Sequence, residues 1–196
     1  MNPAERKRRA AVLRISRKIH RTTGALLFAF FFLTAVTGLL LGWKKHSGGY
    51  ILADTAKGKS SDQNDWLSIS VLTERADQIA RERIDPNIST ELDRIDIRPD
   101  KGIVKFVYLN NYWGVQLDMT TGELLQIERR RSDFIERVHD GTVLDLWFGV
   151  DGGYLKLAYT SVLGTALLIF TITGFWLWLG PIEFRRHSRR TIGLKN

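Results

Sequence analysis

Residues Gly24–Trp43 read GALLFAFFFLTAVTGLLLGW, and residues Tyr154–Gly180 read YLKLAYTSVLGTALLIFTITGFWLWLG. Lys156 is the only charged residue in either stretch. Twenty helical residues span roughly 30 Å, the thickness of the hydrocarbon core of a bilayer. Because backbone polar groups cannot stay unpaired in lipid, both stretches should be helices. The sequence therefore predicts a two-pass membrane protein with transmembrane helices over residues 22–43 and 154–180.

Charged residues outside these stretches give the orientation of the chain. Residues 1–21 carry eight Lys or Arg and one acidic residue, whereas residues 181–196 carry five and one. Residues 44–153 carry fifteen Lys or Arg and nineteen Asp or Glu. Because basic segments stay on the cytoplasmic side of a membrane, we expect two cytoplasmic ends and an exported middle. The net charge of +8 is then a topology signal. It makes the lipid bilayer the expected partner and does not point to nucleic acid.

The exported segment, residues 44–153, has the pattern of an α+β domain. Residues 54–65 are polar and rich in Gly and Ser, which predicts a loop. Ser68 or Ser70 can cap a helix that runs to about Arg83, because apolar residues recur there at helical spacing.

Short alternating stretches separated by tight turns follow this helix and predict an antiparallel meander. The predicted strands cover residues 92–98, 103–109, 112–118 and 123–129. Acidic and basic residues alternate along them, as is typical of a solvated face. A short helix is expected to end near His139, and residues 142–153 are expected to lie at the outer membrane surface. The predicted fold class is thus a membrane α+β protein in which two transmembrane helices bracket this domain.

Several chemistries have no support in the sequence. Cysteine is absent, which excludes disulfides, thiolate metal sites and cysteine nucleophiles. The sequence contains no G-x-S-x-G, H-E-x-x-H, Walker or Rossmann pattern. We therefore predict no catalytic residue.

Small residues mark one face of each predicted transmembrane helix. At 100° per residue a stripe in the first helix contains His20 and Phe31 together with three glycines and a threonine. The candidate packing residues are Gly24, Thr34, Gly38 and Gly42 in the first helix and Gly164, Thr171 and Gly174 in the second. Such residues allow close helix packing, within the chain or in an oligomer. Alternatively, the glycines near His20 leave room for a flat ring such as haem.

The chain has four histidines, and their positions form two groups. His20 and His187 belong to the cytoplasmic ends, whereas His46 and His139 belong to the exported segment. A continuous helix would separate His20 from His46 by roughly 39 Å, so these two cannot share one cofactor. Each group could give two axial imidazoles to a haem iron, an arrangement suited to electron transfer across a membrane. The alternative is that all four are interfacial histidines among basic residues.

Three stretches resemble a known family. They are RKIHRTTGALLFAFFFLTAVTGLLLGW at residues 17–43, ERVHDG at residues 136–141 and TITGFWLW at residues 171–178. Their order and spacing are similar to those of PepSY-associated transmembrane proteins. The middle of the chain, with its predicted helix followed by strands and the stretch LDMTTGELL at residues 117–125, resembles a PepSY domain.

The resemblance implies a protein of the bacterial inner membrane with a periplasmic PepSY-like domain. Some members of the wider family are haem-containing ferric-siderophore reductases, and their histidines would map onto His20 and His139, with haem b as the cofactor. This chain has two membrane helices where the larger reductases have four or more, and Thr22-Thr23 where a tryptophan is usual. A homo-oligomer would make up for this difference, since a homodimer would contain four membrane helices and eight histidines.

Three functions therefore remain open. The chain is a haem-binding electron-transfer or ferric-siderophore reductase component in iron acquisition, an accessory subunit of a larger membrane complex, or a regulatory module that binds a peptide or peptidase. If it is an enzyme, the expected activity is that of a haem-dependent membrane reductase component.

Overall fold

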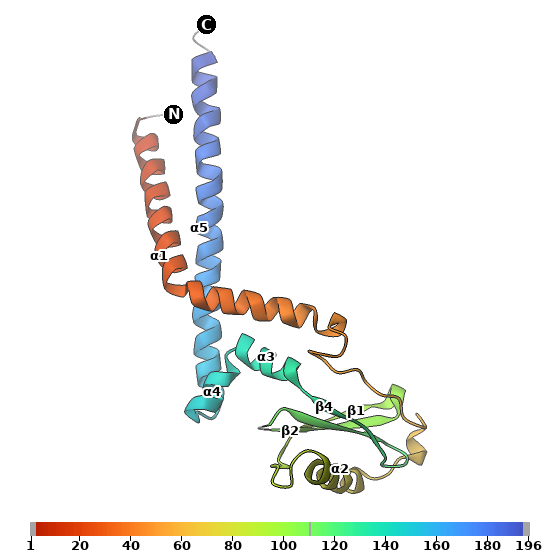
Figure 1. Ribbon diagram of the computed structural model, residues 1–196. Helices are drawn as coiled ribbons and strands as arrows, with labels where there is room; N and C mark the ends of the chain where they lie inside the picture. The colour runs from red at the N-terminus through yellow and green to blue at the C-terminus, as the bar shows by residue number, and fades with distance from the viewer. Residues whose placement is uncertain (1–2, 110, 194–196) are drawn as a thin grey trace. The chain divides into compact units, whose positions relative to one another are not determined.

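The computed structural model describes residues 3–109 and 111–193, and their side chains except those of residues 6 and 183–193. The chain divides into two compact units (Figure 1). The helical unit comprises the chain up to Val36 and again from Val138, and the sheet unit comprises Thr37–Arg137. Residues 138–153, assigned from sequence to the exported domain, thus cluster with the long helices.

Two long helices dominate the helical unit. Helix α1 covers Pro3–Gly42 and helix α5 covers Tyr154–Gly193, each with 40 residues. Both contain an apolar window long enough to cross a bilayer. Only 6% and 11% of the residues in these windows are buried, so their apolar side chains face outward, as contact with lipid requires. The basic residues before Thr22 are part of α1, which is therefore longer than the span predicted from hydropathy. Figure 1 shows that α1 bends along its course.

The sheet unit confirms the predicted meander. Its four antiparallel strands are in the order β1-β2-β3-β4, with helix α2 beside them. The elements are α2 Ile69–Arg83, β1 Leu92–Arg98, β2 Ile103–Tyr108, β3 Trp113–Asp118 and β4 Leu124–Arg129. Ser68 caps α2, because its side chain accepts a hydrogen bond from the Val71 N–H. Short 3₁₀ turns cover Lys44–His46, Gln63–Asp65 and Pro99–Lys101.

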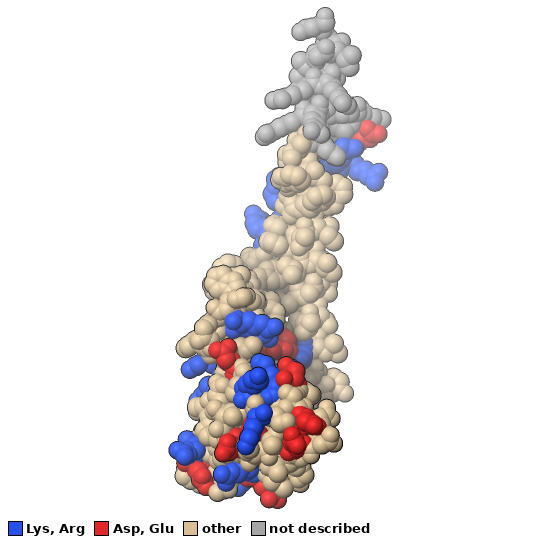
Figure 2. All heavy atoms as spheres, turned by 90° about the vertical axis from the view of Figure 1, so that its right-hand side faces the viewer, with Lys and Arg blue, Asp and Glu red and all other residues tan. Residues whose placement is uncertain are grey.

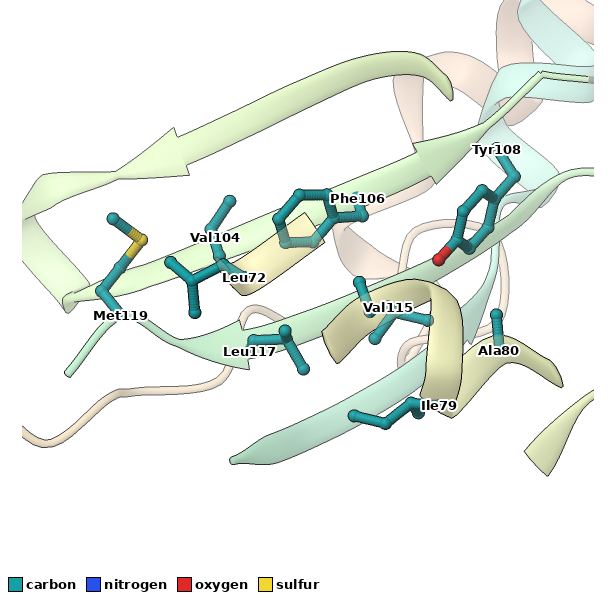
Figure 3. Close-up of a cluster of buried hydrophobic side chains, with 10 residues drawn as sticks. Leu72, Ile79, Ala80, Val104, Phe106, Tyr108, Val115, Leu117 and Met119 are labelled. Carbon is teal, nitrogen blue, oxygen red and sulfur yellow. The ribbon is translucent and has the colours of Figure 1, made fainter. Parts of the chain in front are cut away.

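One face of the sheet forms the hydrophobic core against α2 (Figure 3). Alternate residues of a strand point to the same face, so β2 and β3 present apolar side chains to the helix at every second position. The fully or nearly fully buried members are Leu72, Ala76, Ile79, Ala80, Val104, Phe106, Tyr108, Val115, Leu117 and Met119. The buried residues of α2 recur at helical spacing, whereas those of β2 and β3 recur at every second position. Each element is therefore recognisable from sequence by its own spacing.

The opposite face of the sheet is polar but buried, so the prediction of a solvated face was wrong there. Glu128 on β4 pairs with Arg130 at 2.7 Å and with Lys105 on β2 at 3.6 Å. The side chains of these three residues are only 2%, 8% and 5% exposed. Gly114 makes room for them, because a Cβ there would lie 3.1 Å from Glu128 Cγ. We call Lys105, Glu128 and Arg130 the buried ion layer.

An extended stretch of chain, residues 51–61, hydrogen-bonds to this polar face and is called the strap. The side-chain amide of Gln116 donates to the Asp54 carbonyl at 3.2 Å and accepts from the Ala56 N–H at 3.1 Å. The same amide donates to Glu128 at 2.6 Å, so it links the strap to the buried ion layer. Most of the strap lies in the stretch predicted as a loop. It is indeed irregular, but the side chains of Gln116 and Asp118 on β3 bond several of its backbone polar groups.

Asp118 ties the strap to the turn after β3 and makes stability depend on pH. Its carboxylate accepts the backbone N–H groups of Lys59, Thr120 and Thr121 at 2.6 to 2.9 Å. Burial alone would raise the pKa of Asp118, but these N–H groups outweigh it and lower the pKa below its ordinary value. As the pH falls, Asp118 is therefore protonated at a higher pH in the unfolded chain than in the folded chain.

We expect Asp118→Asn to flatten the acid limb of the stability curve. In the wild type, the contribution of Asp118 is complete above an ordinary aspartate pKa of about 3.9 and is lost as the pH falls through the lower folded value. The melting temperature of the full chain in detergent, measured from pH 7 to pH 2.5, tests this. Glu123→Gln, at an exposed position, is the matched control and should leave the curve unchanged. An equally steep acid limb for both variants would contradict the assignment.

Two short helices connect the sheet unit to α5. Helix α3 covers Arg131–His139 and helix α4 covers Thr142–Phe148. Both agree with the sequence-based expectation of a short helix near His139 followed by a separate segment from residue 142.

Candidate functional site

The His20 ring lies between side chains of the two long helices. It stacks on the Phe170 ring with a centroid distance of 3.8 Å and an interplanar angle of 23°. Its Nδ1 atom lies 3.1 Å from the Phe170 carbonyl oxygen and 3.1 Å from the Thr173 hydroxyl. His20 is half-buried there, and Thr173 is buried.

These contacts favour one tautomer of the His20 ring. A carbonyl oxygen only accepts, so Nδ1 must carry the proton and donate it. Thr173 donates its own hydroxyl proton within α5, to the Ile169 carbonyl at 2.7 Å, and its oxygen can then accept from the same Nδ1–H. In this tautomer the lone pair of the imidazole is on Nε2. This is the arrangement of metal-binding histidines, whose other ring nitrogen donates to a carbonyl or carboxylate.

Two glycines allow the close approach of α1 and α5 around His20. A Cβ at Gly174 would lie 3.3 Å from the His20 Cε1 atom, and a Cβ at Gly24 would lie 2.9 Å from the Phe170 ring. Further along, the Thr34 hydroxyl lies 3.4 Å from the Tyr159 hydroxyl. Residue numbers thus rise along α1 as they fall along α5, and the part of α1 before its bend runs antiparallel to α5 (Figure 1).

The other predicted packing residues lie elsewhere. A Cβ added at Gly42 or Gly164 would have no described atom within 4 Å, so these two glycines border open space. Thr171 is exposed, and Gly38 is half-buried. Of the predicted packing residues, Gly24, Thr34 and Gly174 meet the opposite helix.

The remaining histidines lie in other elements of the chain. His46 is exposed in the 3₁₀ turn after α1, within the sheet unit. His139 ends α3 and is half-buried. The side chain of His187 lies outside the described residues. Its backbone is in α5, thirteen residues or about 20 Å beyond Gly174 along the helix.

The HDG sequence around His139 forms a tightly bonded corner at the start of α5. Asp140 accepts from the Thr142 N–H at 2.9 Å and pairs with Lys156 at 2.5 Å. Burial raises the pKa of Asp140, but Lys156 and Thr142 lower it more, so its pKa lies below the ordinary value. Lys156, the one charge in the second apolar stretch, is therefore neutralised. Gly141 adopts φ +82° directly against the Tyr159 ring, where a side chain would clash.

Sequence reasoning missed Phe170 and Thr173 as partners of His20. Of the predicted packing residues on the second helix, Gly174 meets His20, whereas Gly164 and Thr171 lie about 120° around the helix from that face. The signal in the sequence was the adjacent pair Thr173-Gly174. Its hydroxyl can bond a ring nitrogen, and the missing side chain of its glycine leaves room for the ring. Among the described residues, no group of three His, Asp or Glu side chains could hold a metal ion.

A cavity of about 520 Å³ lies between the first turns of α1 and the later part of α5. It is lined by Glu5, Arg8, Arg9, Val12, Leu13, Trp176 and Gly180. Its walls combine guanidinium groups with apolar side chains, and His20 is not among them.

Comparison with known proteins identifies the chain by its membrane region. No curated protein and no solved structure matches it. The family model for the PepSY-associated TM region matches residues 17–193, which include both apolar helices, the His20 contacts and the HDG corner. The protein is therefore a membrane protein and belongs to the PepSY-associated TM region family.

Proposed function

We propose that the protein is a haem-binding electron-transfer component of the bacterial inner membrane, acting in ferric-siderophore reduction and iron acquisition. The supporting observation is the Nδ1–H of His20, held at 3.1 Å from the Phe170 carbonyl. This contact orients the ring and leaves the Nε2 lone pair for an axial bond to iron. Bound haem b would supply reversible one-electron chemistry, and the chain would supply the ligand, its orientation and an apolar surround.

The spacing of the histidines bears on how many copies are required. The HDG corner meets α5 at Tyr159, whereas His20 meets α5 at Gly174. These positions are fifteen residues, or about 22 Å, apart along the helix. His20 and His139 of one chain therefore cannot ligate the same iron. In a homodimer, each haem would take one imidazole from each copy, either two His20 or two His139 side chains.

The antiparallel helices support the proposed topology. They bring the basic start of α1 and the basic end of α5 to the same end of the helical unit, and basic segments stay in the cytoplasm. Residues between the spans would then be periplasmic, and the sheet unit would be the PepSY-like domain. Figure 2 shows Lys, Arg, Asp and Glu intermixed on the face of the sheet unit that is turned toward the viewer, as suits an aqueous compartment.

The absorption spectrum of the purified full chain tests this function. We expect protein from haem-replete membranes to show a Soret band, and His20→Ala to lose at least half of it. Thr173→Val keeps the shape of the residue but removes the hydroxyl beside Nδ1. It should retain haem with an altered midpoint potential. His46→Ala, which removes an exposed histidine, is the control. It should retain the part of the Soret band that His20→Ala loses.

A wild-type chain with no Soret band would contradict the redox proposal. It would favour an accessory subunit of a larger membrane complex, whose partner would cover part of the outward-facing apolar surface of α1 and α5. Co-purification of a membrane partner in mild detergent would then be the decisive measurement.

A further inference from the structure

Helix α4 carries an aromatic tip that no described residue covers. Trp147 is 75% exposed and Phe148 is 72% exposed, with Leu146 beside them at 44%. Tyr154, the first residue of α5, is 69% exposed. We call Leu146, Trp147, Phe148 and Tyr154 the aromatic tip.

The opposite side of α4 is fixed to the first turn of α5. The buried carboxylate of Asp145 accepts the N–H groups of Leu155 and Lys156 at 2.9 and 3.0 Å. It therefore caps α5, whose first N–H groups have no partner within the helix. Val143 is also buried. The tip is thus held on the fold by a cap and is not a loose loop.

The aromatic tip is continuous with the lipid-facing surface of α5. Tyr154 begins the apolar span Tyr154–Ile182, and Leu157 and Val162 on the next turns are 64% and 59% exposed. Indole and phenol rings favour the headgroup level of a bilayer, where one edge is apolar and the other is wet. Lys156 on the first turn of α5 is compensated by Asp140. The exposed Asp151, between Phe148 and Tyr154 in the chain, suits the wet edge of the headgroup region.

We propose that the aromatic tip inserts into the headgroup region of the bilayer and sets the depth at which α5 enters the membrane. The Asp145 cap transmits this depth to the helix, because it joins α4 to the first turn of α5. The occupant of the exposed aromatic surface is therefore lipid, and the inference does not depend on whether haem is bound.

Depth-dependent quenching in vesicles tests the proposal on the full chain. The chain has no cysteine, so Trp147→Cys gives a single labelling site for a bimane fluorophore without any further change. Trp147 is exposed, so this variant should fold. Val71→Cys on α2, 49% exposed in the sheet unit, is the matched control, and Phe28→Cys within the first span marks the apolar interior.

In phosphatidylcholine vesicles, we expect lipids brominated near the carbonyl end of the acyl chain to quench the label at position 147 at least about twofold more than the label at position 71. Lipids brominated deep in the chain should quench position 28 more than position 147. Equal, weak lipid quenching at positions 147 and 71 with full access to iodide would overturn the proposal. Protection from iodide without lipid quenching would also overturn it, because another protein would then cover the tip.

Discussion

Glu128→Ala should destabilise the sheet unit by about 3–5 kcal/mol, the range found when one partner of a buried ion pair is removed. The Glu128 carboxylate is the partner of both Lys105 and Arg130, and its side chain is only 2% exposed. Arg130 would keep Asp133, at 2.8 Å, but Lys105 would lose its one ion-pair partner among the described residues. Gln116 would also lose an acceptor at 2.6 Å.

Thermal unfolding of the full chain in detergent, followed through the strand signal in circular dichroism, measures this effect. One kcal/mol shifts the melting temperature of a 60–100-residue domain by about 4–8 °C, so the shift should exceed 10 °C. Glu123→Ala removes a carboxylate from an exposed position and should shift it by less than about 2 °C. Similar shifts for Glu128→Ala and Glu123→Ala would show that the buried ion layer contributes no more than a surface charge.

A triple variant separates burial of charge from loss of packing. Replacing Lys105, Glu128 and Arg130 together by Met, Gln and Met removes all three charges while retaining most of the volume. Buried ion clusters are often replaced by apolar residues at little cost, so this variant should be closer to wild type than Glu128→Ala. If it is less stable than Glu128→Ala, side-chain shape and not charge compensation would explain the effect.

The regular elements of this fold could be predicted because each shows its own spacing. Apolar residues in α2 recur at helical intervals, and those in β2 and β3 recur at every second position, so Leu72 and Phe106 point to the same core. The two spans are recognisable because about twenty uncharged residues follow one another. Local pattern and tertiary packing agree at these positions.

The burial of the polar face of the sheet could not be predicted, because the sequence pattern of its strands does not depend on what covers them. Alternating Lys and Glu along a strand has the same pattern whether water or another segment covers it. The strap that covers Glu128 is sixty or more residues away in sequence and has no periodicity. Only the three-dimensional structure shows that Gln116 binds this segment.

The candidate site was predictable in part. The positions of His20 and Gly24 follow from the stripe on the first helix, because the part of that stripe from His20 to Thr34 faces α5. The facing residues Phe170 and Thr173 were not predicted, because small residues lie on several faces of this apolar helix and do not single out the face that meets α1. A buried hydroxyl next to glycine, as at Thr173-Gly174, is a sharper indicator than glycine alone.

Gly102→Ala should release the strap from the sheet. Gly102 has φ +63° and ψ 34° after the turn Pro99–Lys101, a conformation that costs a residue with a Cβ about 1–3 kcal/mol. A Cβ there would also overlap the carbonyl oxygen of Ser60, which is backbone and cannot rotate away. The strap must therefore move, and the hydrogen bonds of its neighbouring N–H groups should break.

Hydrogen exchange of the full chain in detergent gives the readout. The amide of Gly58 donates to the Lys101 carbonyl at 2.8 Å and the amide of Lys59 donates to Asp118 at 2.6 Å. Both should exchange at least about tenfold faster in Gly102→Ala, since a loss of 1.4 kcal/mol in local stability corresponds to a factor of ten. Gly48→Ala is the matched control, because Gly48 has φ +60° with nothing within 4 Å of an added Cβ. It carries the same backbone cost without the overlap, so protection of the strap amides should persist. If the amides of Gly58 and Lys59 exchange equally fast in both variants, general destabilisation and not the overlap with Ser60 would explain the loss of protection in the strap.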